Sequence, residues 1–236
     1  MIEDKRKTIV KEYLASLFLY WYGNRKAIRQ ILQQDWKGNA TESDRLCLGA
    51  GLSMIDIECM WRNHWFAKGT QTASVDREMK ESFGWMLVQD DAYLQTYRPT
   101  RLWEKLALII LFDQIPRNVF RGTPSAYVYD HVALKFAVEI AEATEVFANL
   151  AFCFQATVCI CLCHAERLET QDLLSRCVNQ NMNTTLLNKH SLWHGLRKIA
   201  THHRERIEWF GRFPERNAIL GRISTSEEFA LLQQLR

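Results

Sequence analysis

Turn-forming residues are scarce in this chain. Its 236 residues include only 4 Pro and 10 Gly. A β-barrel or β-sandwich reverses direction roughly every ten residues and needs many more of both, whereas long helices need few. No run of alternating β-branched residues is long enough to form a sheet. Because the hydrophobic fraction of 47% is typical of a folded protein with a buried core, the sequence predicts an ordered, all-α protein.

The chain also lacks a large excess of either charge. Its 30 basic and 27 acidic residues leave a net charge of +3. This balance excludes overall electrostatic attraction as a basis for binding nucleic acid or an anionic membrane surface. Recognition of an ion must therefore depend on a local cluster of charges. We expect no nucleic-acid partner, and a protein partner remains an open alternative.

One uncharged stretch, residues 146–163, has the minimum length of a membrane-spanning helix. Asn149, Gln155 and Thr157 interrupt it, and the residues on either side carry charges of both signs instead of a positive cluster. We therefore expect a buried helix at this position and no membrane segment.

The pattern of cysteines indicates a reducing compartment. The seven Cys are an odd number, and no secretory leader is recognisable at the start of the sequence, so we expect a soluble, cytoplasmic protein. Cys159, Cys161 and Cys163 alternate in a way that suggests a zinc or copper site. On a helix, however, Cys159 and Cys163 share a face while Cys161 points away, and the two-residue gap of a zinc knuckle is absent. We expect buried thiols, no metal site and no cofactor.

Hydrophobic residues at helical spacing divide the chain into roughly ten helices. The expected helices cover residues 5–22, 25–36, 43–65, 75–86, 100–115, 127–143, 147–163, 168–181 and 188–210, with a short one starting at 224. Gly23 is suited to a helix C-terminus. The polar segment 69–74 predicts a loop, and Pro116 predicts the end of the apolar helix 100–115. We expect one all-helical domain, residues 1–236, built as an antiparallel array.

A first polar cluster stands at the end of helix 100–115. Asp113 directly follows the apolar run LALIILF, so its carboxylate lies at the rim of a dry interior. A buried carboxylate needs a partner or a shifted pKa. Arg117 or Arg121 can supply that partner, and Gln114 and Asn118 add further polar groups to the same segment.

A second cluster follows the uncharged stretch and contains His164, Glu166 and Gln171. Imidazole titrates near neutrality, so His164 beside a carboxylate is suited to proton transfer. The same residues are also typical of a helix boundary, because the helix dipole favours His at a C-terminus and Glu at the next N-terminus. The sequence leaves both interpretations open.

The third cluster lies in the Gly- and Pro-containing segment 210–225 and includes Arg212, Arg216, Asn217 and Arg222. Planar guanidinium groups suit carboxylates and phosphates, and backbone amides at the start of the following helix can add donors. The segment therefore predicts an anion pocket. The alternative is that these Arg brace helix ends by pairing with acidic side chains of the protein.

Two long segments, LALIILFDQIPRNVFRGTPSAYVYDHVAL and FGRFPERNAILGRISTSEE, resemble the signature segments of domain of unknown function 924, an uncharacterised bacterial family. The resemblance extends to FLYWYG at residues 18–23, to Trp65, Phe66 and Asp76, and to the His164 segment. It therefore covers nearly the whole chain. It implies a tetratricopeptide-like antiparallel helical array, and it implies no particular activity. All three polar clusters match the family's pattern.

Two functions are compatible with these clusters. The first is binding of an anionic ligand, either a small carboxylate or phosphate metabolite or an acidic peptide, at an Arg-rich pocket. The expected ligand-binding residues are Gln114, Arg117, Asn118, Arg121, Gln171, Arg212, Arg216, Asn217 and Arg222. The second is an enzyme on a small anionic substrate, with His164 as general acid or base oriented by Asp113 or Glu166. A small-molecule pocket that contains His164 favours the enzyme, and an open groove without it favours the binder.

Overall fold

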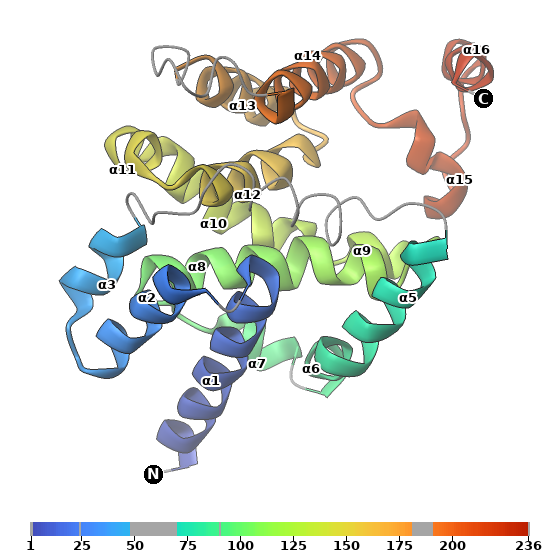
Figure 1. Cartoon of the computed structure of the whole chain (residues 1–236). Coiled ribbons are helices and arrows are strands. Elements are labelled where there is room, and N and C mark those ends of the chain that lie inside the picture. The colour runs from blue at the N-terminus through green and yellow to red at the C-terminus, as the bar shows by residue number, and fades with distance from the viewer. Residues whose placement is uncertain (1, 24, 48–69, 90, 181–190, 236) are drawn as a thin grey trace.

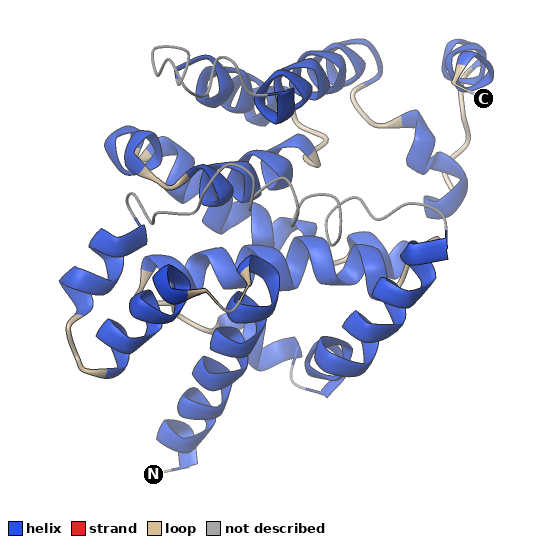
Figure 2. Ribbon diagram, in the orientation of Figure 1, coloured by secondary structure: helices blue, strands red, loops and turns tan. Residues whose placement is uncertain are grey.

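The computed structural model describes residues 2–23, 25–47, 70–89, 91–180 and 191–235. Helices and short turns account for this part of the chain, and no strand occurs in it (Figure 2). The predicted all-α class is therefore confirmed. The predicted helix 43–65 and the residues Trp65 and Phe66 lie largely or wholly outside the described ranges.

The helices are short to medium in length. In chain order they are α1 (Ile2–Tyr22), α2 (Lys26–Trp36), α3 (Ala40–Cys47), α5 (Thr70–Met79), α6 (Trp85–Gln89), α7 (Asp91–Thr96), α8 (Leu102–Ile109), α9 (Ile115–Val119), α10 (Asp130–Glu142), α11 (Thr144–Asn149), α12 (Phe152–Cys163), α13 (Leu168–Gln180), α14 (Ser191–Phe210), α15 (Asn217–Leu220) and α16 (Ser226–Gln234). Single turns of 3₁₀ helix at Pro124–Tyr127 and Pro214–Arg216 precede α10 and α15.

The helices stack in layers that follow the order of the chain (Figure 1). In this view α1, α6 and α7 lie at the bottom, α8 and α9 cross the middle, α2 and α3 lie on the left, and α5 lies on the right against α9. Above them come α10 to α12 and then the pair α13 and α14. After α14 the chain turns back on the right of this view through α15. This segment reaches the turn after α12, where Arg222 pairs with Glu166.

Aromatic side chains join the layers into one continuous core. Phe18 of α1 contacts Trp103 of α8 and Phe154 of α12, with ring centroids 5.8 and 5.7 Å apart. Tyr22 packs edge-to-face on Phe154, and its hydroxyl shares a 2.6 Å hydrogen bond with Thr157 Oγ1. These buried contacts fix α12, whose end carries His164, against the first and central helices.

The central helix does not end before Pro116. A π-turn at Ile110–Gln114 connects α8 to α9, and the amide of Ile115 donates to the carbonyl of Ile110, five residues back. Pro116 therefore stands in the first turn of α9, where its missing N–H costs no hydrogen bond. The prediction that Pro116 ends this helix is wrong, because the wider π-turn resets the hydrogen-bond register just before the proline.

The uncharged stretch forms two helices instead of one. α11 ends at Asn149, Leu150 and Ala151 are extended, and α12 begins at Phe152. Gln155 stabilises the break, because its side-chain amide donates to the carbonyl of Phe147 over 2.9 Å. Every residue of α12 is buried. No helix in the described ranges is long and apolar enough to cross a membrane.

Two further local predictions need correction. Residues 70–74 were expected in a loop but form the first turns of α5. Ser43 was expected near the start of a helix, but α3 begins at Ala40, and the Ser43 hydroxyl donates to the carbonyl of Ile31 in α2 over 2.8 Å. In both segments packing against neighbouring helices decides the structure and overrides the polar local composition. The buried, free thiols of Cys159, Cys161 and Cys163 agree with the prediction.

Candidate functional site

Asp113 is held inside the protein by the π-turn between α8 and α9. Only 1% of its side chain is exposed. The extra backbone residue of a π-turn rotates side chains relative to a regular helix, and such turns are frequent at functional sites. Asp113 Oδ1 lies 3.0 Å from Arg117 Nη1, and the side-chain amide of Gln114 donates to Oδ2. Of the two arginines that the sequence offered as partners, Arg117 pairs with this carboxylate and Arg121 does not.

His164 caps the C-terminus of α12 and meets Asp113 across 51 residues of sequence. Its Nδ1 lies 2.8 Å from Asp113 Oδ1 and 3.0 Å from Oδ2. A carboxylate accepts hydrogen bonds, so Nδ1 carries a proton and donates. In the neutral imidazole Nε2 then has a free lone pair. Asp113 is thus the carboxylate in contact with the His164 ring, whereas Glu166 contacts other groups.

The charges around this pair act in opposite directions. Burial by itself raises the pKa of Asp113, but Arg117 and His164 outweigh burial and lower the pKa to about 2. Burial, followed by the nearby Arg117 guanidinium, lowers the pKa of His164 below its ordinary value despite the Asp113 carboxylate. At neutral pH the pair is therefore a carboxylate hydrogen-bonded to a neutral imidazole.

Arg117 also forms a bidentate pair with Asp130 at the start of α10. Both N–H···O distances are 2.8 Å. Burial raises the pKa of Asp130 in spite of this pairing with Arg117. One guanidinium thus pairs with two carboxylates, and its N–H donors are occupied by groups of the protein itself.

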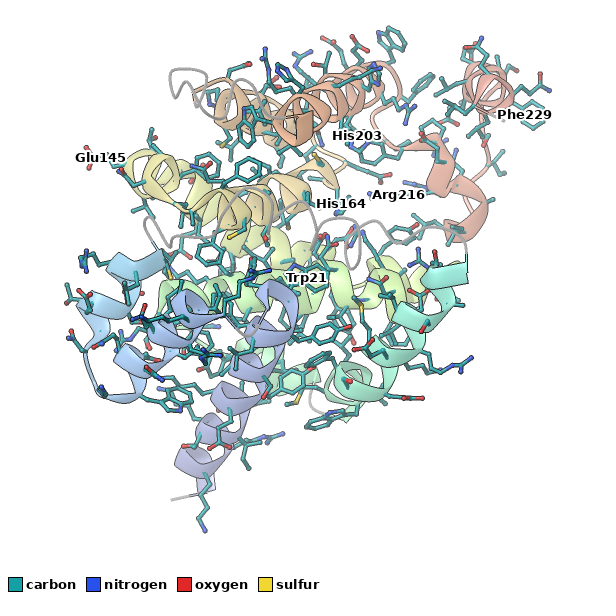
Figure 3. All side chains as sticks on the ribbon, viewed as in Figure 1. Trp21, Glu145, His164, His203, Arg216 and Phe229 are labelled. Atoms are coloured by element: carbon teal, nitrogen blue, oxygen red, sulfur yellow. The ribbon has the colours of Figure 1, made fainter. Side chains whose placement is uncertain are left out.

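Arg216 is the predicted arginine that remains most available. Its guanidinium lies between the rings of Tyr127 and Phe213, with centroid distances of 4.9 and 4.6 Å. Its nearest carboxylate contact is Asp130 Oδ2, 3.8 Å from Nη1, which is too long for a direct hydrogen bond. Figure 3 shows this side chain extending from the C-terminal segment, residues 211–225, toward His164.

A pocket of about 960 Å³ brings these groups together. Asp113, Asp130, His164 and Arg216 line its polar end. Much of the remaining wall is apolar and consists of Val128, Leu134, Val138, Cys161, Leu173 and Leu220. The volume is within the range of small-molecule sites, which are mostly apolar with a few convergent polar groups. The pocket has the features that favour an enzyme and also the cationic group that favours an anion binder.

Two of the other predicted arginines pair with acidic side chains away from the pocket. Arg121 forms a bidentate pair with Asp76, at 2.6 and 2.8 Å. Arg212 does the same with Glu228, at 2.6 and 2.9 Å. These guanidinium groups brace helices, as the alternative interpretation of the sequence described.

Glu166 fastens the C-terminal segment to the turn after α12. It accepts bidentate hydrogen bonds from Arg222, at 2.8 and 2.9 Å, and a third from the backbone N–H of Phe213, at 2.8 Å. Burial raises the pKa of Glu166, but these hydrogen bonds outweigh it and the net shift is downward. Glu166 lines the pocket, yet its carboxylate is occupied by the protein itself.

The predicted amide residues also form internal contacts. Gln171 Nε2 donates to the carbonyl of Ala165 over 2.7 Å, and Asn217 Nδ2 donates to Glu228 Oε2 over 3.1 Å. Asn118 Nδ2 donates to the carbonyl of Gln114 over 2.9 Å. These side chains position the turns that surround the pocket and do not line it.

Sequence reasoning missed Asp130, Tyr127, Phe213 and His203. Asp130 looks like an ordinary acidic residue at a helix start, and Tyr127 and Phe213 look like core aromatics. His203 belongs to a charged stretch of α14, yet its Nδ1 lies 2.9 Å from the carbonyl of Cys163 and its ring packs on Phe213. These residues are recognised by their proximity to the C-terminal segment around Arg216, and this proximity exists only in the folded structure.

The geometry permits anion binding and proton transfer. In the described ranges no three His, Cys, Asp or Glu side chains are placed to hold a metal ion. The chemistry of the pocket thus depends on the imidazole of His164, the guanidinium of Arg216 and the carboxylates of Asp113 and Asp130.

Comparison with known proteins relates the chain to a family and to a solved structure. The model of the family described as bacterial proteins of unknown function, DUF924, matches residues 56–235. A solved structure of a protein of unknown function from Agrobacterium tumefaciens is 28% identical, with a TM-score of 0.56, and the match covers 76% of this chain and 94% of that one. No curated protein matches the sequence. The family match includes every residue of the site, and the chain belongs to the bacterial family DUF924.

Proposed function

We propose that the pocket binds a small anionic molecule, with Arg216 as its main cationic contact. The observation that carries this proposal is the 3.8 Å separation between Arg216 Nη1 and Asp130, which leaves guanidinium donors without a close carboxylate at the polar end of a pocket. The flanking rings of Tyr127 and Phe213 hold the guanidinium in place, which reduces the entropy lost when a ligand binds.

The surrounding charges support an anionic ligand of low charge. Asp113 and Asp130 are both paired with Arg117, and Glu166 is paired with Arg222. At this end of the pocket Arg216 is therefore a guanidinium whose N–H donors form no close ion pair. A carboxylate or phosphate oxygen beside Arg216 replaces water that solvates the guanidinium and forms charge-assisted hydrogen bonds.

A thermal-shift experiment tests the anion site. Carboxylates such as acetate and succinate, and inorganic phosphate, should raise the unfolding temperature of the protein in proportion to their affinity, because a ligand of the folded state stabilises it by mass action. Arg216→Gln should abolish the shift. Arg121→Gln, which removes an arginine that pairs with Asp76 outside the pocket, is the matched control and should leave the shift unchanged. A shift that persists in Arg216→Gln contradicts the proposal.

A second function, general-base catalysis on a small anionic substrate, is favoured by one observation. His164 donates through Nδ1 to Asp113, so the lone pair of Nε2 is available in a residue that lines the pocket. In ester hydrolysis this nitrogen takes a proton from water while the water oxygen attacks the acyl carbon. The ester C–O bond then breaks, and the leaving oxygen takes the proton back from the imidazolium.

The catalytic hypothesis has its own test. Release of p-nitrophenol from p-nitrophenyl esters that carry a free carboxylate should fall by about 100-fold or more in His164→Gln, the size expected for loss of a general base. His202→Gln replaces an exposed histidine of α14 and serves as the control. If the wild type hydrolyses these esters and His164→Gln does so at the same rate, His164 is not the base.

We also propose a helix arrangement and a cellular location for this protein. We infer a tetratricopeptide-like arrangement, supported by the packing of α2 on α3 and of α13 on α14. We also infer a cytoplasmic location, supported by the buried thiols that remain free, since oxidising compartments favour disulfides.

A further inference from the structure

The pocket is elongated along two helices. The residues that α10 contributes include His131, Leu134, Val138 and Glu142, which recur at the spacing of one helix face. The distance along the helix axis from His131 to Glu142 is about 16 Å, from the 1.5 Å rise per residue. A ligand that lies along this helix face is therefore elongated.

The facing helix α13 lines the pocket in the same direction. Its N-terminal residues Glu169 and Thr170 lie toward the polar end, and Leu173 and Arg176 follow. A second cavity of about 150 Å³ shares Glu142, Leu173 and Arg176 with the pocket. The groove between α10 and α13 thus extends from Arg216 and His164 toward the C-terminal ends of both helices.

The middle of the groove is aliphatic. Leu134 and Val138 of α10 face Leu173 of α13, and Cys161 of α12 contributes a buried thiol. The charged side chains that α10 and α13 also contribute, Lys135, Glu142, Glu169 and Arg176, are exposed, whereas Leu134, Val138 and Leu173 are not. A bound peptide needs partners for its backbone N–H and C=O groups, whereas an alkyl chain needs none. The lining favours an alkyl chain over a peptide.

The polar end favours a single negative charge. Arg216 faces the carboxylate of Asp130 at 3.8 Å, so a dianion such as phosphate meets repulsion close to the guanidinium that attracts it. A carboxylate has one charge and a planar pair of oxygens that matches the guanidinium fork. His164 lines the same end, and its unprotonated Nε2 can accept a hydrogen bond from a hydroxyl or water.

We propose that the ligand is a dissolved aliphatic carboxylate whose head group binds Arg216 and whose chain lies between α10 and α13. The proposal rests on the anion site described above. The chain contributes binding energy through burial against Leu134, Val138 and Leu173, so affinity depends on chain length.

Isothermal titration calorimetry with acetate, hexanoate and decanoate tests this inference. Affinity should rise by up to about fourfold per added methylene, the value for full burial of a CH₂ group. Val138→Gln should weaken decanoate binding and leave acetate binding unchanged. Val88→Gln makes the same substitution on α6, where the side chain is 73% exposed, and should bind all three acids as the wild type does. Val138→Thr, which keeps the shape of valine, should shift decanoate affinity in the same direction as Val138→Gln.

Each contrary outcome identifies what has failed. If the three acids bind with equal affinity and Arg216→Gln abolishes this binding, the alkyl-chain inference is wrong and the anion site is supported. Binding that Arg216→Gln leaves unchanged overturns the anion site and the inference with it. Tighter binding of a leucine-rich hexapeptide than of decanoate overturns the inference in favour of a peptide.

Discussion

The hydrogen bond between His164 and Asp113 joins two segments that are 51 residues apart in sequence. It fixes the tautomer of the imidazole, and Arg117 in turn fixes the carboxylate. At the scale of single residues the sequence could indicate that Asp113 needs a partner, because a carboxylate after a long apolar run is costly. It could not indicate which arginines stay available, since this depends on the positions of Asp76, Asp130 and Glu228 in the fold.

Asp113→Asn should lower the free energy of unfolding by about 3 kcal/mol at neutral pH, the cost of breaking a buried ion pair from one side. Urea denaturation followed by circular dichroism measures it. Asp76→Asn breaks the pair with Arg121, whose side chain is 53% exposed, and should cost about 1 kcal/mol or less. Equal losses in the two variants contradict the structural role assigned to Asp113.

The lowered pKa of His164 predicts acid sensitivity. In the unfolded chain an imidazole titrates near pH 6.5, but folded His164 resists protonation because it is buried beside Arg117. Between the lowered pKa of folded His164 and its pKa in the unfolded chain, the unfolded chain binds more protons than the folded one. Stability therefore falls as pH falls below about 6.5. His164→Asn, which keeps a donor near Asp113, should flatten this dependence in part.

The remaining pH dependence includes His203, whose pKa burial also lowers. Denaturation midpoints measured from pH 7.5 to pH 5 give the comparison, and His202→Asn is the control because His202 is exposed. An unchanged slope in His164→Asn is inconsistent with an imidazole that stays neutral in the fold.

At the scale of elements the sequence located most helices and misplaced several of their boundaries. Gly23 does follow the end of α1, with a positive φ of 82° that glycine adopts at little cost. The break at Leu150 and Ala151 was missed, because an apolar run has no local signal for the extended backbone that Gln155 supports. The π-turn before Pro116 was missed for a similar reason, since its register depends on packing around Asp113.

The capping of α16 was predictable from its hydroxyl and acidic residues. Thr225 Oγ1 accepts from the amide of Glu228 over 3.2 Å, and Glu228 Oε2 accepts from the amide of Thr225 over 2.8 Å. Thr225→Ala should therefore cost about 1 kcal/mol of stability in chemical denaturation, while Thr225→Ser keeps the cap. Ser226→Ala, one residue further on, should stay within about 0.5 kcal/mol of the wild type. A similar loss in both alanine variants contradicts a specific cap.

At the scale of the whole molecule, the site forms because the C-terminal segment returns to the turn after α12. The local polar clusters were visible in the sequence, but their distances were not. Glu166 illustrates the difference: the pattern suggested a role beside His164, and the fold uses the carboxylate to hold Arg222 and the amide of Phe213. Long-range ion pairs of this kind have no periodicity that a sequence pattern reveals.

Glu166→Gln should loosen the C-terminal segment and displace Arg216 in the pocket. The substitution removes the negative charge that holds Arg222 and weakens the hydrogen bond from the amide of Phe213. Arg216 lies between these two residues in sequence. The amide of Phe213 should exchange hydrogen faster, and trypsin should cleave faster after Arg216, because local opening limits both reactions. Acetate binding should weaken as Arg216 loses its position. Glu169→Gln changes an exposed carboxylate of the same pocket and should leave cleavage and exchange unchanged. If Glu166→Gln also leaves both rates unchanged, the segment is held by its apolar contacts alone, and Arg216 does not depend on Glu166 for its place.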